Sequence, residues 1–422
     1  MNLRKLDNIK KELFILSILI IFFYRSPYIF LNGRFMAEEG SIYFANAYKY
    51  NLFYSLFFID FNSGYLNLWA NFSGIISNFF SLSLAPLISN YLALIPKVII
   101  LYLALYKDSI FLKTFFNKIL FCLFIFLSPL NIPEIWLNSI NSQIFFCIIT
   151  FTLCFLNYSK NNINFYFLIL IFLSGLTGIY SCILLPVFYF KFFLYKTKQD
   201  LLNFLTLLFC TITQISIVVY AKTSNLIYSG KLNFIDSEIL INYVYNVLVK
   251  VFIGTSLTKY IYYNYLNLDL FLLSVIIIIF LTVIFVLLFY FIKNNKIINS
   301  DNKFIILSLL FVLLSTSVIV MIGAIDQKVG GRYSAIPSFY TLCLVLTLLN
   351  IFDNFKIKYL FLCLILFSIF SGAYEFKPPK DRNHYLDCNG CPNWKEEIKK
   401  FNDDNNYILK IWPYPKKGIS LN

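Results

Sequence analysis

The chain has 422 residues, of which 59% are hydrophobic and 13% are charged, and its formal net charge is +14. A mean hydropathy of +0.73 excludes an ordinary soluble protein, because apolar runs near membrane-spanning length recur throughout the sequence. The positive charge would indicate nucleic-acid binding in a soluble protein, but here it collects in short loops between apolar runs, so we interpret it as topology and contact with anionic lipid.

The apolar runs predict an all-α polytopic membrane protein with about eleven transmembrane helices. The predicted spans, in chain order, are 13–31, 84–106, 118–131, 143–157, 164–176, 179–194, 201–221, 268–292, 304–325, 334–350 and 359–373. Several are shorter than the roughly 20 residues that a helix needs to cross a bilayer. We expect such spans to tilt or to stop short of the far side, which is tolerated where helices line a protein-enclosed cavity. The sequence therefore predicts an aqueous cavity that opens to the outer face.

Lysine and arginine alternate between the loops, and this alternation predicts the orientation. The basic set comprises the N-terminus, 107–118, the loop at Lys160, 191–198, 293–303 and 356–358. The other set comprises the loops around Glu38, Asn138, Ser174, Asp236 and Asp326. We expect the basic set in the cytoplasm and the other set outside, which places the N-terminus inside and the C-terminus outside. No small-x-small cleavage site follows the first apolar run, so we expect this run to remain as an anchor.

Two long segments are predicted to lie outside. Residues 32–83 form the first outer loop, with amphipathic pieces near 42–58 and 66–80 that we expect to lie on the membrane surface. Treating 66–80 as a second span instead would place the lysines of 107–118 outside, against the charge rule. In the second segment, 222–267, the apolar stretch 247–257 is too short to span. Composition changes after residue 373, so we divide the chain into a membrane domain, 1–373, and a small extracytoplasmic tail, 374–422.

Glu38 and Glu39 stand side by side just beyond the first span, in an acid-poor chain. A sugar hydroxyl is a poor nucleophile, so a glycosyl transferase needs a carboxylate to take its proton as the new bond forms. If the following residues are helical, the two carboxylates point about 100 degrees apart. One would then face the cavity, while the other orients a loop or binds an acceptor or a metal. The alternative is that the pair caps an interfacial helix and complements its dipole.

Cationic side chains at the outer ends of spans are candidates for holding a phosphate. Arg332 is our first candidate because two glycines precede it and let the backbone approach a ligand. Lys328 could assist it. Arg25, within the outer part of the first span, is a second candidate. The alternatives for Arg25 are snorkelling to the interface and pairing with an acidic neighbour.

The outer loop 133–143 carries side chains that suit sugar hydroxyls and a sugar face, and we take them as candidate substrate-binding residues. They are Glu134, Trp136, Asn138, Asn141 and Gln143. An interfacial tryptophan and polar loop residues also arise without any ligand. Asp60 and Asp326 are weaker candidates for binding an acceptor or a metal, and a divalent metal is left open as a cofactor.

The tail contains Cys388 and Cys391, the two cysteines that lie outside the apolar runs. With His384, the only histidine, they resemble part of a zinc site, for which a fourth ligand is not evident and Asp387 is the one candidate. In an oxidising compartment a disulfide is favoured over a zinc site.

The overall layout resembles the GT-C class of integral-membrane glycosyltransferases, whose members take sugars from polyprenyl-phosphate carriers. The resemblance rests on a long outer loop after the first span, about ten further spans and an outer C-terminal region. Its short motifs are Ala37-Glu38-Glu39-Gly40, with Arg34 just before it, then Gly64-Tyr65-Leu66, Asn138 to Gln143, Gly331-Arg332-Tyr333 and Ile411-Trp412-Pro413.

The resemblance implies a bacterial inner-membrane enzyme in which residues 1–373 form the glycosyltransferase-like domain. It further implies that one of the paired glutamates is the base and that Arg332 holds the donor phosphate, which would give inversion at the anomeric carbon. Arg34 and Tyr333, in or beside the quoted motifs, are then expected to contact substrate.

Our working hypothesis is an extracytoplasmic transferase that moves a sugar from a polyprenyl-phosphate donor to an envelope glycan or a lipid-linked acceptor. One alternative is an O-antigen polymerase or ligase, which would rely on outer-loop arginine or histidine. The other is a non-enzymatic flippase or transporter for a lipid-linked saccharide, which would carry ionisable groups near the middle of the bilayer.

Overall fold

The chain folds mainly into helices, as a computed structural model shows for residues 3–227, 237–265, 299–323, 330–352, 354–377, 385–386, 388, 390–415 and 417–422, together with the single positions 279, 283, 286 and 290. One two-stranded sheet is the only sheet in these parts of the chain. The protein is therefore of the all-α membrane type. The predicted span 268–292 falls almost wholly outside the described residues.

Within the described residues, six helices are long and apolar enough to cross a membrane. They are α6 (Ala85–Tyr106), α11 (Lys198–Thr223), the run Ile239–Ile261, α15 (Ser300–Gly323), the run Gly331–Ile351 that contains α16 (Ala335–Ile351), and α17 (Phe355–Tyr374). Shorter apolar helices are α7 (Phe115–Leu127), α8 (Ser142–Cys154), α9 (Phe165–Leu176), and η3 (Tyr180–Leu184) with α10 (Leu185–Tyr195).

The first helix, α1 (Leu3–Arg25), is not among the six, because charged residues at 10–12 and at Arg25 bound its apolar stretch. The remaining elements are short. They are α2 (Pro27–Asn32), η1 (Glu39–Phe44), α3 (Ala45–Lys49), α4 (Leu52–Leu56), α5 (Leu68–Asn78), η2 (Pro133–Ile135), α12 (Ser237–Tyr243), η4 (Val244–Val249), α13 (Lys250–Tyr265), η6 (Gly331–Ser334), α18 (Trp394–Asp403), β1 (Leu409–Ile411) and β2 (Lys417–Ile419).

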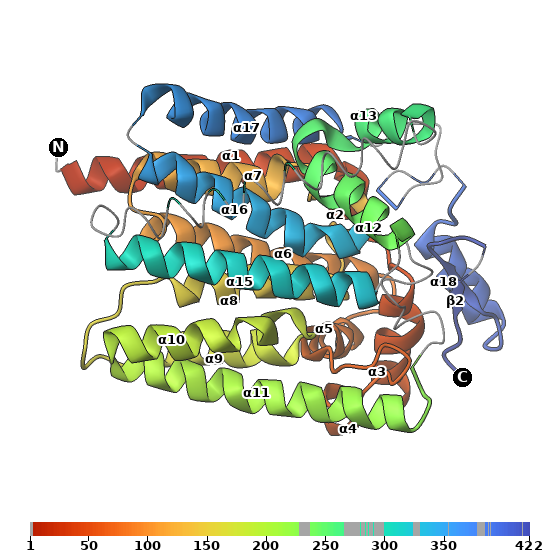
Figure 1. Ribbon diagram of the computed structural model, residues 1–422. Helices are drawn as coiled ribbons and strands as arrows, with labels where there is room; N and C mark the ends of the chain where they lie inside the picture. Colours follow the sequence, from red (N-terminus) through yellow and green to blue (C-terminus); the bar gives the residue numbers. More distant parts are fainter. Residues whose placement is uncertain are drawn as a thin grey trace.

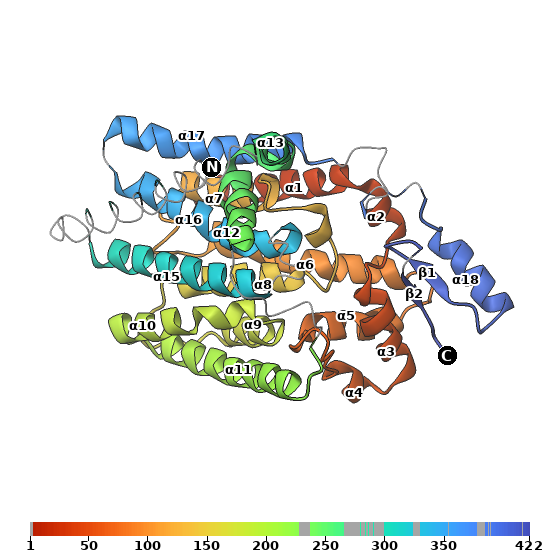
Figure 2. The same ribbon diagram turned by 45° about the vertical axis from the view of Figure 1, so that its right-hand side comes forward.

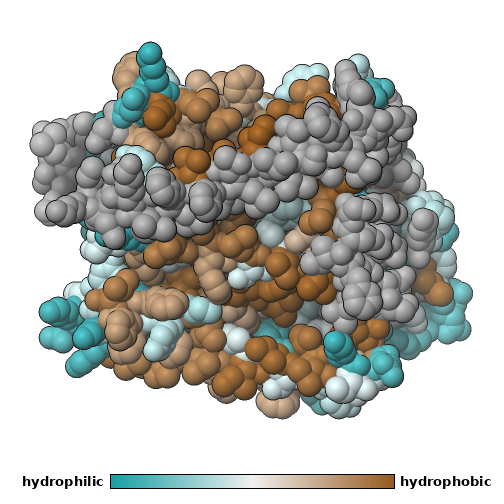
Figure 3. Space-filling view, in the orientation of Figure 1, coloured by the Kyte–Doolittle hydropathy of each residue, from teal (hydrophilic) through white to brown (hydrophobic). Residues whose placement is uncertain are grey.

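The long helices run side by side, so that the connecting loops gather at two opposite ends (Figure 1). At the end with the N-terminus, the loops that we assigned to the basic set meet one another. Contacts there join Lys113 to Asn302, Tyr195 to Asp301, Lys198 to Lys160 and Asn117 to Asn350. The C-terminal tail lies at the other end with the first long loop, where Met36 bridges to Trp412 and Asn67 to Thr177. Hydrophobic side chains cover much of the visible surface between these ends (Figure 3).

One expectation about the first loop is wrong: α5 does not lie on the membrane surface. Most of its residues are buried, and it packs against η1 and α6. Small side chains explain this close packing, since a Cβ at Gly74 would lie 2.7 Å from the carbonyl oxygen of Tyr43 and the Ser73 hydroxyl hydrogen-bonds that of Ser89 at 2.8 Å. At the start of the helix, the Asn67 side chain caps Ala70 N–H and also donates to the carbonyl oxygen of Ile140. α5 therefore ties the first loop to the loop 133–143.

The stretch 247–257 also differs from expectation, because it belongs to a longer helical run, Ile239–Ile261, that is long enough to span. The run breaks at Gly254, whose φ of +84° is the left-handed region that favours glycine. The Glu375 carboxylate accepts hydrogen bonds from the backbone N–H groups of Thr255 and Ser256 after the break, at 2.7 and 2.6 Å. As a result α12 and α13 run in different directions (Figure 2).

The tail packs onto the first loop through a shared hydrophobic cluster. From the tail, Trp394 and Ile419 are buried against Phe35 and Phe44 of the loop, and the Trp394 ring meets the Phe35 ring edge-on at 5.4 Å. β1 and β2 pair antiparallel, with Ile411 opposite Lys417. The tail is thus fixed to the segment that carries the acidic pair.

Candidate functional site

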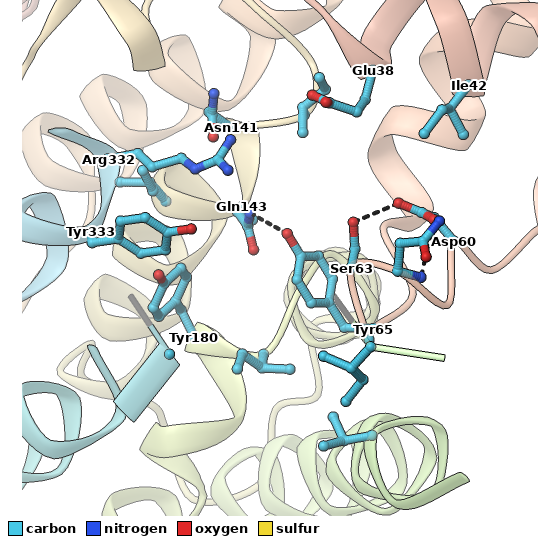
Figure 4. A pocket seen from close by; sticks show the side chains of 18 of the residues that line it. Glu38, Ile42, Asp60, Ser63, Tyr65, Asn141, Gln143, Tyr180, Arg332 and Tyr333 are labelled. Carbon is cyan, nitrogen blue, oxygen red and sulfur yellow. Dashed lines mark hydrogen bonds between the residues drawn. The ribbon is translucent and has the colours of Figure 1, made fainter. Parts of the chain in front are cut away.

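A cavity of about 620 Å³ lies at the end of the molecule that carries the tail. Its polar lining comes from the first loop, the loop 133–143, η3, the start of the run 331–351 and the tail. These polar residues are Glu38, Tyr43, Asp60, Asn62, Ser63, Tyr65, Asn141, Gln143, Tyr180, Arg332, Tyr333 and Lys417. Figure 4 shows Arg332, Tyr333 and Tyr180 projecting from one side and Tyr65, Ser63 and Asp60 from the other. Five distant segments of the chain therefore build one polar site.

Glu38 is the member of the acidic pair that lines the cavity. Its carboxylate lies 3.2 Å from the Lys417 ammonium group of β2, and the two side chains are 33% and 41% exposed. Solvent or a ligand can therefore reach both groups. A carboxylate held this way can accept a proton from a hydroxyl group within hydrogen-bonding reach.

Glu39 points into the protein instead and is 1% exposed. One carboxylate oxygen accepts hydrogen bonds from the Ser89 hydroxyl and from both the N–H and the hydroxyl of Ser139, each at 2.7 Å. The other accepts from Met36 N–H at 3.0 Å. Burial raises the pKa of Glu39 above its ordinary value of 4.5, while these hydrogen bonds oppose the rise. Glu39 therefore clamps the first loop to α6 and to the loop 133–143 and does not reach the cavity.

Arg332 enters the cavity from the start of the run 331–351 (Figure 4). The Glu134 carboxylate holds it, since one oxygen lies 3.8 Å from Arg332 Nε and the other accepts from Arg332 N–H at 3.2 Å. The preceding Gly331 permits this approach: its φ is +55°, and a Cβ there would lie 2.6 Å from the Glu134 carboxylate. Tyr333 lies next to the guanidinium of Arg332, whose Cζ atom is 5.4 Å from the centre of the Tyr333 ring.

Tyr65 and Gln143 form the centre of the cavity wall, where the Gln143 amide donates to the Tyr65 hydroxyl at 3.0 Å (Figure 4). Burial raises the pKa of Tyr65 above its ordinary value of 10.0, so the phenol stays neutral and can donate a hydrogen bond. Gly178 packs against this wall. A Cβ at this position would lie 2.2 Å from the side-chain amide oxygen, Oε1, of Gln143.

Asp60 also lines the cavity, but its own loop uses both of its oxygens. They accept from Asn62 N–H at 3.2 Å and from the Ser63 hydroxyl at 2.6 Å. This pattern is that of a turn-forming aspartate.

The loop 133–143 contributes less to the cavity than the sequence suggested. Asn141 and Gln143 line it, and Glu134 touches it only through Arg332. Trp136 and Asn138 are fully buried, which contradicts their predicted contact with substrate. Trp136 packs edge-on against Phe22 at 4.9 Å, and the Asn138 amide donates to the backbone carbonyls of Glu134 and Trp136. Both side chains hold the loop in shape.

Two of the predicted arginines also lie away from the cavity. Arg25 is buried, donates to the Asn131 carbonyl at 2.7 Å and packs over the rings of Trp136 and Phe376 at 4.3 and 4.6 Å. Arg34 donates to the carbonyl oxygen of Tyr385 in the tail, and its own N–H donates to Asn90 at 2.8 Å. Arg25 is thus buried away from any phosphate in the cavity, which corrects its assignment, and Arg34 lies outside the cavity lining. Lys328 lies outside the described residues.

Five polar cavity residues escaped sequence reasoning: Lys417, Tyr43, Tyr180, Asn62 and Ser63. Lysine is abundant in this chain, so a single lysine in the tail gave no signal. The two tyrosines lie in apolar surroundings and resemble ordinary core aromatics. Tyr65 had a weak signal in the quoted motif Gly64-Tyr65-Leu66, where Gly64 has a φ of +79°.

In the tail, the Cys388 and Cys391 side chains form a disulfide. Within the part of the chain that the structure describes, no group of three or more histidine, cysteine, aspartate or glutamate residues could hold a metal ion. Asp326, His384 and Asp387 lie outside that part.

Comparisons with models of protein families, with curated proteins and with solved structures found no match to this chain. The class of this protein is therefore described only by the physical properties of its fold and its cavity. They are those of a multi-pass helical membrane protein with a polar, charged cavity at one end of its helices.

Proposed function

We propose that the protein is a glycosyltransferase that moves a sugar from a polyprenyl-phosphate donor to an envelope glycan or a lipid-linked acceptor. The observation that carries this proposal is that a carboxylate, Glu38, and a guanidinium, Arg332, line one cavity. Sugar transfer from such a donor needs a base for the acceptor hydroxyl and a cation for the leaving phosphate.

The proposal includes the finer topology. About eleven spans cross the plasma membrane of a bacterium, with the N-terminus in the cytoplasm and the cavity and C-terminal tail outside. The charge difference between the two sets of loops supports this orientation. The meeting of the basic loops at the end opposite the cavity agrees with it.

In the reaction, Glu38 accepts the proton of an acceptor hydroxyl while the hydroxyl oxygen attacks the anomeric carbon of the donor sugar. The bond between that carbon and the phosphate oxygen breaks, its electron pair leaves with the phosphate, and the configuration inverts. Arg332 binds the phosphate as its charge develops, for which its planar, permanently charged fork is well suited. Glu39 is assigned no proton transfer, because its oxygens are buried and hydrogen-bonded.

The cavity wall suits both parts of such a donor. Tyr65, Tyr180 and Tyr333 offer aromatic faces and hydroxyl groups for a sugar ring. On another side, Val218 of α11 and Ile319 and Val320 of α15 give the cavity an apolar lining at the level of the long helices. An apolar lining there favours the first isoprene units of a lipid carrier.

The test replaces Glu38 by Gln in a strain in which the chain's own gene is removed, with mass spectrometry of the envelope glycans as the readout. We expect the wild type to restore a sugar residue that Glu38→Gln does not restore at equal membrane levels. Glu396→Gln, an exposed acid on α18, is the matched control and should restore it fully. Full restoration by Glu38→Gln would exclude the assigned base. Movement of a lipid-linked saccharide across liposomes with no new glycosidic bond would instead favour a transporter.

A further inference from the structure

The C-terminal hairpin is mounted directly on the segment that carries Glu38. Ala37 N–H donates to the carbonyl oxygen of Trp412 at 2.7 Å, one residue before Glu38. Two residues after Glu38, Gly40 faces the hairpin so closely that a Cβ would lie 2.7 Å from the Ile419 side chain and 3.1 Å from that of Ile411. β2, which begins at Lys417, therefore has a fixed position beside the carboxylate.

Lys417 is the tail residue that lines the cavity, and Glu38 holds its ammonium group. Arg332 and Lys417, the two cations of the cavity lining among the described residues, are both paired in this way, since Arg332 contacts Glu134. A phosphate ester that enters the cavity must therefore compete with a carboxylate for each cation. The pair at Lys417 is partly exposed and therefore weak, so a dianionic or monoanionic phosphate can displace it.

We propose that Lys417 is a phosphate-binding residue that the C-terminal tail contributes to the site, and that donor phosphate takes it from Glu38. The identification of that phosphate as the head group of a lipid donor rests on the proposed function. While Lys417 holds Glu38, a carboxylate oxygen is occupied by a charged hydrogen-bond donor, which competes with an acceptor hydroxyl for it. Binding of the phosphate frees Glu38 for the acceptor. The donor must therefore bind before transfer can begin, and the tail is part of the catalytic site.

The test measures the affinity of the full-length protein in detergent for farnesyl phosphate, with farnesol and inorganic phosphate as separate probes. Lys417→Gln should weaken farnesyl phosphate binding about tenfold, a change of about 1.4 kcal/mol, and leave farnesol binding unchanged. Lys417→Arg should stay within about threefold of the wild type because the charge is kept. Lys399→Gln, an exposed lysine on α18 of the same tail, should have no effect. Melting temperatures identify any variant that fails to fold.

Glu38→Gln gives the opposite result, and this distinguishes competition from simple loss of a contact. Without the competing carboxylate, Lys417 is free for the phosphate, so farnesyl phosphate should bind about two- to fivefold more tightly. The double variant Glu38→Gln/Lys417→Gln should bind as weakly as Lys417→Gln alone. Unchanged binding in Lys417→Gln, or weaker binding in Glu38→Gln, would overturn the inference.

The outcomes for the proposed function are separate. If the binding results hold but Glu38→Gln still transfers sugar, the phosphate site stands and the assigned base fails. Binding of inorganic phosphate as tight as that of farnesyl phosphate would identify a site for free phosphate and overturn the lipid-linked donor as its ligand.

Discussion

The two adjacent glutamates should respond in opposite ways to the same substitution. In Glu39→Gln, one buried oxygen becomes an NH2 group. If the remaining oxygen keeps the three hydrogen bonds from Ser89 and Ser139, Met36 N–H loses its acceptor, and the new NH2 group that faces it is a second buried donor without an acceptor. Each unsatisfied donor costs about 1–3 kcal/mol, so we expect a loss of about 2–6 kcal/mol in the free energy of unfolding. The opposite placement of the amide leaves more donors unsatisfied and costs more.

Glu38→Gln removes only a partly exposed ion pair with Lys417, which contributes about 0–1 kcal/mol. The assay is thermal unfolding of both variants in the same detergent, combined with their sugar transfer in membranes. Glu39→Gln should melt well below the wild type, whereas Glu38→Gln should melt near it and lose transfer. A Glu39→Gln variant that is as stable as Glu38→Gln and loses transfer would refute the division of roles.

Three further predictions follow from other contacts. Gly331→Ala should lower transfer at least about tenfold, because the added Cβ displaces the Glu134 carboxylate and the positive φ of residue 331 strains an alanine. The control is Gly330→Ala, whose Cβ would lie 3.6 Å from the nearest atoms of Asn246, and equal activity of the two variants would contradict the role of Glu134. Because burial raises the pKa of Glu39, the folded state keeps this proton to higher pH than the unfolded state. The contribution of Glu39 to stability should therefore be largest near and below pH 4.5 and should decrease as the pH rises through the pKa of Glu39 in the folded protein. In the variant Glu39→Gln, the melting temperature should depend less on pH over this range. Arg25→Ala should destabilise the protein by about 2–4 kcal/mol and should change the KM for the donor less than about twofold. A tenfold higher KM at unchanged stability would instead indicate that Arg25 binds the donor phosphate.

The positions of many helices could be predicted from sequence, because a long apolar run is stable in few environments other than a membrane. The expected spans 84–106 and 201–221 correspond to α6, Ala85–Tyr106, and α11, Lys198–Thr223. The fate of α5 could not be predicted. Its burial depends on small side chains that meet η1 and α6, and the sequence of one helix does not specify its neighbours.

The candidate site was predictable where chemistry limits the choice of residue. Arginine is scarce, so Arg332 carried information, and it lies in the cavity with Glu38. Trp136 was misassigned because an aromatic residue in an outer loop can equally pack inward, as it does against Phe22. Lys417 was missed because its role depends on where the tail folds back, which requires the packing of Ile419 against Gly40.

The division of labour between Glu38 and Glu39 has a physical reason in their adjacency. Neighbouring residues at the start of a helical turn point about 100 degrees apart, and here only Glu38 points into the cavity, while Glu39 points into the protein. The inward carboxylate, Glu39, binds Ser139 in the loop that continues to Asn141 and Gln143. It thus fixes the cavity wall to the backbone that carries Glu38. In the proposed reaction the base must lie within hydrogen-bonding reach of the acceptor hydroxyl, and Glu39 would favour this by holding the cavity wall and the backbone of Glu38 together.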